Sequence, residues 1–497
     1  MEKPQHKRSA FSGKIGFVLS AAGASVGLGN IWRFPYLAAK YGGGIFLLIY
    51  IILAFTFGYT MIVAETAIGR MTRKSPVGAF HSFGKGKALS AGGWINAIIP
   101  ILIVPYYSVI GGWVIKYLVE YFLGHSHTLA ADGYFSGFIA NGISAEVCFV
   151  VFTLFTLSII YAGVRNGVER VSRFMMPVLV VLSVVIAGYS ITRPGALEGV
   201  KYFLVPNPKN FSWMTVVTAM GQMFYSLSIA MGILVTFGSY MKKDISIEES
   251  TQNVEFFDTA IAVMAGLMII PAVFAFSGGD PGTLNAGPSL MFITIPKVFD
   301  SMGLGTIVGV LFFLLVLFAA VTSSIALTES AVSTFEDELG WGRKKSTVLI
   351  GGIMLLLGSL SALGYGPLAS VTILGMPFLD FFDFLTNSVM MPIAAIAICL
   401  LVSRVIGLDK IEEEMTLNGQ PFRRKHLVGS IHRVGADAKL GRHGAPPRQS
   451  LARLQGTGAD ILRKCVIELL IQRHFFFRMQ FNHGGSPLRF IIWHHKK

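Results

Sequence analysis

The sequence predicts an all-α membrane protein with ten membrane-spanning helices, arranged as two sets of five in opposite orientation. Hydrophobic residues make up 53% of the chain and charged residues only 14%, which is too apolar for a soluble protein of 497 residues. The apolar runs are long enough to cross a hydrocarbon core of about 30 Å. Small polar residues interrupt two of these runs, the first and the sixth.

The ten expected spans divide into a first five-helix repeat, 15–192, and a second, 213–403, joined by an extracellular loop, 193–212. The individual spans are expected at 15–37, 43–69, 94–120, 145–163, 174–192, 213–239, 254–276, 305–333, 346–363 and 376–403. Because five is an odd number, the second set starts from the opposite face of the membrane, so a structural repeat must be inverted.

Lys and Arg predict the orientation, because cytoplasmic loops are enriched in them. They gather in the N-terminal segment 1–14 and in alternate loops, whereas the loop 121–143 contains neither. We therefore expect a multi-pass protein of the cell's inner (plasma) membrane. Its N-terminus lies in the cytoplasm, and an even number of spans returns the C-terminus to the same side.

Residues 404–497 form an expected cytoplasmic tail that carries most of the net charge of +14. From Pro421 onward there are 15 Lys and Arg residues, three Asp and Glu residues, and seven of the 11 His residues. One interpretation is a tail that binds anionic lipid. The other is a C-terminus read out of its proper frame and largely disordered. We expect no nucleic-acid partner, since the rest of the chain is nearly neutral.

The two interrupted spans predict where a ligand binds. The first contains GASVGLGNIWRFPY (23–36) and the sixth YSLSIAMG (225–232). Unwound backbone at membrane depth persists only where it lines a cavity or holds a ligand, and breaks at matching positions of two repeats mark a transporter's midplane site. Close helix packing by small residues is the alternative for each break alone. The GxG of the first break is no dinucleotide motif, because no strand precedes it.

The motifs GLGNIWRFPYLAAKYGGG and AAVTSSIAL resemble the neurotransmitter:sodium symporter family, in particular its bacterial amino-acid branch. The resemblance covers about residues 10–425 and ends near Val428. It implies the leucine-transporter fold and a sodium-coupled symporter, not an enzyme, that imports an amino acid by alternating access. One or two sodium ions, a small amino acid and the lipid bilayer are the expected partners, with no organic cofactor.

The resemblance also implies two sodium sites built from oxygen atoms, which hard cations prefer. The residues of one site are Gly23, Val26, Ala319, Thr322 and Ser323. Those of the other are Ser25, Asn30, Ser226 and Asp258, completed by the substrate carboxylate. Asp258 stands where the family often has asparagine, and Ala262, one turn later, is not acidic, which implies that chloride is not required. Alternatively, Asp258 lies at the cytoplasmic end of its helix.

For the substrate, the resemblance implies a carboxylate bound by the N–H groups of Leu28 and Gly29, where a half-helix begins. The expected substrate-binding residues are Ser25, Leu28, Gly29, Ile103, Tyr107, Tyr225, Ser226, Ser228, Met231 and Leu327. Gly27 occupies the position at which monoamine carriers have an aspartate, so an α-amino acid with a neutral hydrophobic or aromatic side chain is expected. Without the resemblance, most of these apolar residues would be interpreted as packing.

Arg33 and Asp383 are the expected extracellular gate, because each charge at membrane depth needs a partner or water. By resemblance, Glu65 is expected to brace the unwound segments. Two other classes fit poorly: a channel would need a repeated polar pore lining, and a membrane metal hydrolase would need a motif such as HExxH. A substrate-binding but non-transporting relative of the family stays open.

Overall fold

The computed structural model describes residues 9–278, 289–420 and 422–429. These residues belong to one compact unit, Met1–Ala436, and within these ranges the regular structure is entirely helical, with two isolated bridges. The predicted all-α membrane class is confirmed. The predicted tail, 404–497, is described only as far as residue 429; this part contains a helix, Leu408–Met415, and the rest, to which the prediction of disorder mainly applied, lies outside the described ranges.

The first half contains the helices that carry the first five expected spans and the connections between them. They are α1 (Lys14–Ser25), η1 (Gly29–Arg33), α2 (Phe34–Lys40), α3 (Gly44–Leu53), η2 (Ala54–Gly58), α4 (Tyr59–Thr72), α5 (Pro76–His81), α6 (Lys87–Phe122), α7 (Ser126–Ala130), α8 (Tyr134–Ala140), α9 (Gly142–Tyr161), η3 (Val164–Glu169), α10 (Arg170–Ile191), α11 (Ala196–Leu204) and η4 (Pro208–Asn210).

The second half contains the other five expected spans and a short helical segment after them. Its helices are α12 (Trp213–Ser226), α13 (Ile233–Tyr240), α14 (Ile247–Ser277), η6 (Leu290–Thr294), α15 (Ile295–Asp300), α16 (Gly305–Leu339), α17 (Arg343–Leu363), α18 (Phe378–Asp383), η7 (Phe384–Met390), α19 (Met391–Leu400), η8 (Leu401–Ile406), α20 (Leu408–Met415) and η9 (Leu417–Gly419).

The membrane-length helices agree with the expected spans. Among the described residues, eight continuous helical segments are long and apolar enough to cross a membrane, and the bent first pair, Lys14–Ser25 with Gly29–Lys40, makes a ninth. The segments α12 and α13, which flank Leu227–Gly232, occupy the position of the sixth expected span. The predicted count of ten is therefore consistent with the structure once both interrupted helices are included.

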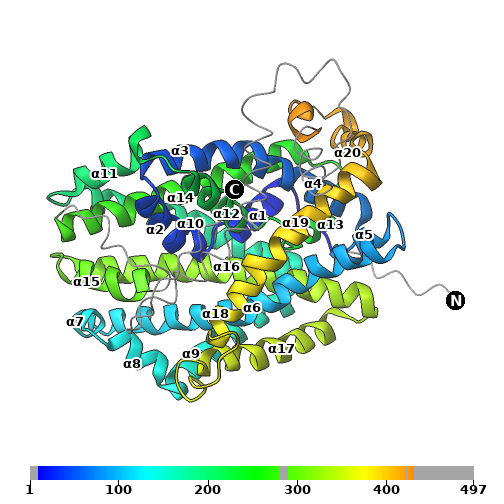
Figure 1. The fold of residues 1–497 in the computed structure, drawn as a ribbon. Coiled ribbons are helices and arrows are strands. Elements are labelled where there is room, and N and C mark those ends of the chain that lie inside the picture. Colours follow the sequence, from blue (N-terminus) through cyan, green and yellow to red (C-terminus); the bar gives the residue numbers. More distant parts are fainter. Residues whose placement is uncertain (1–8, 279–288, 421, 430–497) are drawn as a thin grey trace, which may run out of the picture. The chain divides into compact units, whose positions relative to one another are not determined.

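The interrupted helices lie inside the bundle, where long helices surround them (Figure 1). The segment α1 contacts α10, α14 and α16, and α13 contacts α4 and α16. Small residues permit the closest approach: a Cβ at Gly238 of α13 would lie 2.9 Å from the Thr66 Cα of α4. Backbone-to-backbone packing of this kind is common between membrane helices, because it maximises van der Waals contact.

Candidate functional site

The break in the first span contains two glycines, Gly27 and Gly29, whose surroundings leave no room for a side chain. Helix α1 ends at Ser25, Val26 is extended (φ −77°, ψ 92°), and the chain bends by 52° before it continues as a helix. A Cβ at Gly27 would lie 2.6 Å from the Ser323 Oγ, and one at Gly29 would overlap the Tyr225 ring. The glycines thus let the backbone of the first span approach its neighbours.

The break in the sixth span depends on left-handed backbone. Ser228 (φ 54°), Ala230 (φ 60°) and Gly232 (φ 70°) all have positive φ, which costs a non-glycine residue about 1–2 kcal/mol. Two hydrogen bonds hold this conformation. The Ala230 N–H donates to the Glu65 Oε1 at 2.8 Å, and the Ser228 Oγ donates to the Ala24 carbonyl at 3.0 Å. Glu65 therefore contacts the unwound segment directly.

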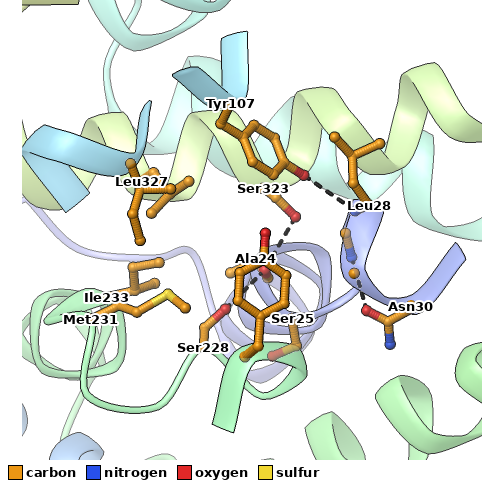
Figure 2. Close-up of a pocket in the computed structure, with 14 residues that line it drawn as sticks. Ala24, Ser25, Leu28, Asn30, Tyr107, Ser228, Met231, Ile233, Ser323 and Leu327 are labelled. Atoms are coloured by element: carbon orange, nitrogen blue, oxygen red, sulfur yellow. Dashed lines mark hydrogen bonds between the residues drawn. The ribbon is translucent and has the colours of Figure 1, made fainter. Parts of the chain in front are cut away.

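A small cavity of about 30 Å³ lies between the two breaks. Figure 2 shows its walls. They are formed by Ala24, Ser25, Gly27, Leu28, Gly29, Asn30, Ile103, Tyr107, Tyr225, Ser228, Met231, Ile233, Ser323 and Leu327. Every predicted substrate residue is in this lining except Ser226, which accepts a hydrogen bond from Asn30. Ala24 and Ile233 were not predicted, and no pattern in the sequence marks them.

One end of the cavity is polar because backbone and side-chain groups converge there. The Leu28 N–H donates to the Tyr107 hydroxyl at 3.2 Å, and the Gly27 N–H donates to the Asn30 Oδ1 at 3.3 Å. Figure 2 shows Tyr107 and Asn30 on either side of the broken backbone. The other end is lined by apolar side chains such as Met231 and Leu327.

A first cluster of oxygen atoms joins the first span to α16. The Ser323 Oγ lies 3.3 Å from the Gly23 carbonyl and 3.4 Å from the Val26 carbonyl. One residue earlier, the Thr322 Oγ1 lies 3.2 Å from the Ala319 carbonyl. All five residues proposed for one sodium site thus lie together, although they come from two helices far apart in the sequence.

A second polar cluster joins both broken spans to α14. The Asn30 Nδ2 donates to the Ser226 Oγ at 2.9 Å and to the Asp258 Oδ1 at 2.8 Å. The other carboxylate oxygen of Asp258 accepts from the Tyr50 hydroxyl at 2.8 Å. Asp258 is 0% exposed and lies well inside Ile247–Ser277. The alternative that it sits at a helix end is therefore wrong.

Two polar contacts of this region were missed at the sequence level. Tyr50 holds Asp258, and the Gln222 Nε2 donates to the Gly29 carbonyl at 3.1 Å. Each is a polar side chain within an apolar run, and that was the available signal. Sequence position could not show which helix each one faces.

The two expected gate residues are held by separate partners. The Arg33 guanidinium lies over the Tyr225 ring, 5.1 Å from its centroid. The Asp383 Oδ1 accepts from the Asn387 Nδ2 at 2.6 Å and from the Tyr106 hydroxyl at 3.3 Å. No ion pair joins Arg33 to Asp383 within the part of the chain that the structure describes. Tyr225 therefore separates the cavity from the arginine.

The model of the sodium:neurotransmitter symporter family matches residues 8–129 and 119–422. The chain belongs to this family. Its members are secondary transporters and not enzymes, so this symporter moves a small-molecule solute together with sodium across a membrane. The large apolar helices of the structure agree with an integral membrane protein.

The symporter is similar to several known proteins over most of its length. It is 35% identical to an uncharacterized sodium-dependent transporter of Bacillus subtilis, covering 83% of this chain and 91% of the relative. It is 27% identical to the sodium- and chloride-dependent taurine transporter of Rattus norvegicus, covering 82% and 72%. Among solved structures, MhsT in complex with L-phenylalanine matches with 35% identity and a TM-score of 0.78, covering 86% of this chain and 98% of MhsT.

Proposed function

We propose that this symporter imports a neutral α-amino acid with a hydrophobic or aromatic side chain, driven by sodium and working by alternating access. The main support is the cavity between the broken spans, which has one polar end and one apolar end. Its polar end, at Leu28 and Tyr107, suits a carboxylate, and its apolar end suits an uncharged side chain. The complex of MhsT with L-phenylalanine supports the same substrate class.

Gly27 supports an α-amino acid over an amine without a carboxylate. A Cβ at this position would meet the Ser323 Oγ at 2.6 Å and the Tyr107 hydroxyl at 3.1 Å, so the site has no room for an acidic side chain here. The substrate must therefore bring its own negative charge to the polar end. Its amine then faces the carbonyls of Ser25, Tyr225 and Ser226.

We propose that one or two sodium ions travel with the substrate as cargo. One ion is bound by Gly23, Val26, Ala319, Thr322 and Ser323, and the other by Ser25, Asn30, Ser226 and Asp258. Asn30 lines the cavity and also bonds to Ser226 and Asp258. Because one side chain serves both the substrate and an ion, binding of either favours binding of the other.

Chloride is not required under this proposal. Asp258 supplies a fixed negative charge beside the second sodium, and its carboxylate already accepts hydrogen bonds from Asn30, Tyr50 and Ser226. A carboxylate in that position leaves no need for an anion to balance the ion's charge.

Access from the outside is controlled by Arg33 and Asp383. Arg33 stacks on Tyr225, which itself lines the cavity. A substrate that moves the Tyr225 ring therefore also moves the arginine. The repeats 15–192 and 213–403 supply one broken helix each. The symporter lies in the plasma membrane with both termini on the cytoplasmic side.

Uptake into proteoliposomes tests the proposal. Radiolabelled leucine, phenylalanine and lysine are supplied with an inward sodium gradient or with a matched potassium gradient. Accumulation of leucine or phenylalanine in sodium alone, also in chloride-free buffer, is expected. Lysine serves as the control for side-chain charge. Binding without accumulation would instead support the non-transporting alternative. If the protein showed no binding and no uptake of these amino acids, the proposed substrate class would be refuted.

A further inference from the structure

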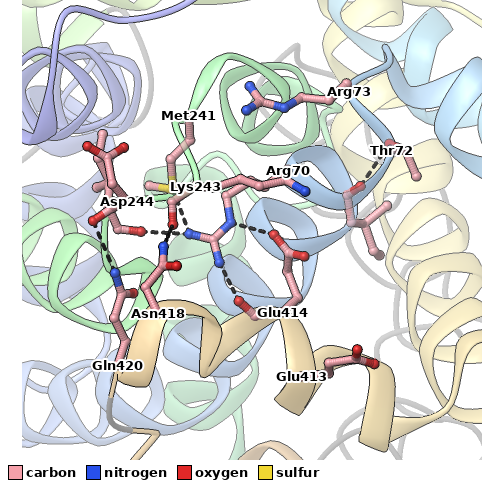
Figure 3. Close-up of polar contacts among 12 residues, drawn as sticks. Arg70, Thr72, Arg73, Met241, Lys243, Asp244, Glu413, Glu414, Asn418 and Gln420 are labelled. Carbon is pink, nitrogen blue, oxygen red and sulfur yellow. Dashed lines mark hydrogen bonds and ion pairs between the residues drawn. The ribbon is translucent and has the colours of Figure 1, made fainter.

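Arg70, at the end of α4, is a buried arginine that the proposed function does not use. It is 0% exposed. Its Nε donates to the Glu414 carboxylate at 2.5 Å, a second nitrogen donates to the Glu414 carbonyl, and the third donates to the Ile245 carbonyl at 2.6 Å (Figure 3). A buried charge is tolerated only when it is paired and fully hydrogen-bonded. These acceptors therefore fix the position of the guanidinium.

The acceptors come from two segments that are far apart in the sequence. Ile245 lies in the loop 241–246 after α13, and Glu414 lies in α20, beyond the tenth expected span. Two more bonds join these segments. The Asn418 Nδ2 donates to the Lys243 carbonyl and the Gln420 Nε2 to the Asp244 carbonyl, each at 3.1 Å. Consecutive carbonyls of the loop are thus held, and we refer to Arg70, Glu414, Asn418 and Gln420 as the clasp.

The clasp holds the loop that follows α13, and the last turns of α13 contact α16. The Tyr240 hydroxyl, at the last residue of α13, donates to the Glu329 Oε1 at 2.7 Å. One turn earlier, the Thr236 Oγ1 lies 3.2 Å from the Ser330 Oγ and 3.4 Å from the Ser333 Oγ. Both residues of α13 therefore close a polar contact with α16 on the side predicted to face the cytoplasm.

The helix that leads into the clasp also carries the candidate outer gate. Asp383 ends α18, and the chain continues through η7, α19 and η8 into α20. The outer part of this helix contacts α6, whereas α20 contacts α4. The clasp thus ties the inner end of this tenth expected span to α4 and to the loop after α13.

We propose that Arg70 and Glu414 are positioning residues of the transport cycle. The clasp holds the end of α13 where Tyr240 and Thr236 reach α16, and so keeps the inner side of the symporter closed. Opening on that side requires the end of α13 to leave α16, which the clasp resists for as long as it holds the loop 241–246. This inference goes beyond the proposed substrate and ion sites, because none of the clasp residues lines the cavity.

The test is cysteine accessibility at the α13–α16 contact in the full chain. Ser333, which is 0% exposed, is replaced by cysteine in a background without the native cysteines, and its reaction with a water-soluble maleimide is followed in sodium-free buffer. Glu414→Gln weakens one charge-assisted hydrogen bond, so the labelling rate is expected to rise about tenfold. Sodium-dependent substrate binding should weaken in parallel.

Glu413→Gln is the matched control, because Glu413 is the exposed neighbour in the same helix and the change in charge is identical. It should leave the labelling rate unchanged. Equal rates in the two variants would overturn the proposal. Labelling needs no uptake, so a wild-type chain that fails to transport would refute the symporter function and leave this test intact.

A second variant guards against misfolding of Glu414→Gln. Asn418→Gly with Gln420→Ala removes bonds at the partly exposed edge of the clasp, and glycine accepts the positive φ of Asn418 (59°) without strain, so the protein should fold. We expect a smaller rise in labelling of about threefold, as for loss of neutral hydrogen bonds. A folded double variant that labels at the wild-type rate would overturn the proposal as well.

Discussion

The two broken spans both contain unwound backbone, but they accommodate it in different ways. In the first, Val26 is extended and glycines on both sides bring the backbone itself against its neighbours. In the second, Ser228, Ala230 and Gly232 adopt left-handed backbone, and side chains project into the cavity. The comparison indicates a division of labour: the first span supplies backbone groups for the polar end, and the sixth supplies side chains such as Ser228 and Met231 to the cavity lining.

The partners that stabilise the two breaks differ accordingly. Asn30, on the first span itself, accepts from the Gly27 N–H, and Tyr107 accepts from the Leu28 N–H. The sixth span depends on Glu65 from α4, which accepts from the Ala230 N–H. Because lipid offers no hydrogen bonds, each break persists only with such partners.

The largest effect is expected from Gly29→Val. A Cβ there overlaps the Tyr225 ring, and overpacking of about 3 kcal/mol would lower substrate affinity by more than about 100-fold. The measurement is binding of labelled amino acid at saturating sodium. The control is Gly221→Val on α12, where a Cβ would meet nothing within 4 Å, and it should bind normally. Normal binding by Gly29→Val would refute the backbone carboxylate site.

Asn30→Ala should weaken sodium and substrate binding together. It removes a side chain that bonds to Ser226 and Asp258 while lining the cavity. Loss of a hydrogen bond to a charged group costs about 1.5–3 kcal/mol, so both affinities should fall by at least about tenfold. Substrate binding over a range of sodium concentrations measures this. Asn207→Ala, at an exposed position before η4, is the control and should leave both affinities unchanged. A fall in only one of the two affinities for Asn30→Ala would show that the two sites are independent.

Asp383→Asn should slow uptake by about tenfold, equivalent to about 1.4 kcal/mol in the barrier, with sodium affinity nearly unchanged. Asp383 lies outside the two polar clusters and is held by Asn387 and Tyr106. Uptake and sodium-dependent binding are measured on the same preparations. Asp380→Asn, in the same short helix and bonded to Tyr365, is the matched control. Equal losses in both assays for Asp383→Asn would remove it from the gate.

The smallest effect is expected from Met231→Leu, which tests the side-chain role of the sixth span. A volume-conserving apolar exchange costs less than about 1.5 kcal/mol, so the preference between leucine and phenylalanine should change by less than about tenfold. Sodium affinity should stay constant. Met220→Leu is the control, because Met220 is buried in α12 outside the cavity lining. A shift in sodium affinity would contradict the division between the spans.

Much of the fold could be predicted because hydropathy and backbone chemistry are local properties. An apolar run such as the one within Lys87–Phe122 marks a span whatever surrounds it. A glycine-rich interruption such as 23–36 can also be recognised locally. Unwound backbone within lipid persists only where its polar groups find partners in a cavity or a ligand. The resemblance then placed most residues of the cavity lining.

The remaining contacts could not be predicted because they depend on which helix faces which. Tyr50 and Gln222 are polar residues in apolar runs, yet only the structure brings them to Asp258 and Gly29. Likewise, Arg33 was expected beside Asp383, and the structure holds it on the Tyr225 ring.

The sequence alone determined that this chain is a helical membrane protein and where its first and sixth spans are interrupted, and it predicted a binding site at their small residues. Each of these follows from the rule that backbone polar groups need partners within lipid. Only the tertiary structure decided that Ser323 reaches the carbonyls of the first span and that Arg70 meets Glu414 and Ile245. Such contacts join residues 175 to 344 positions apart, and helix packing alone sets which side chains meet.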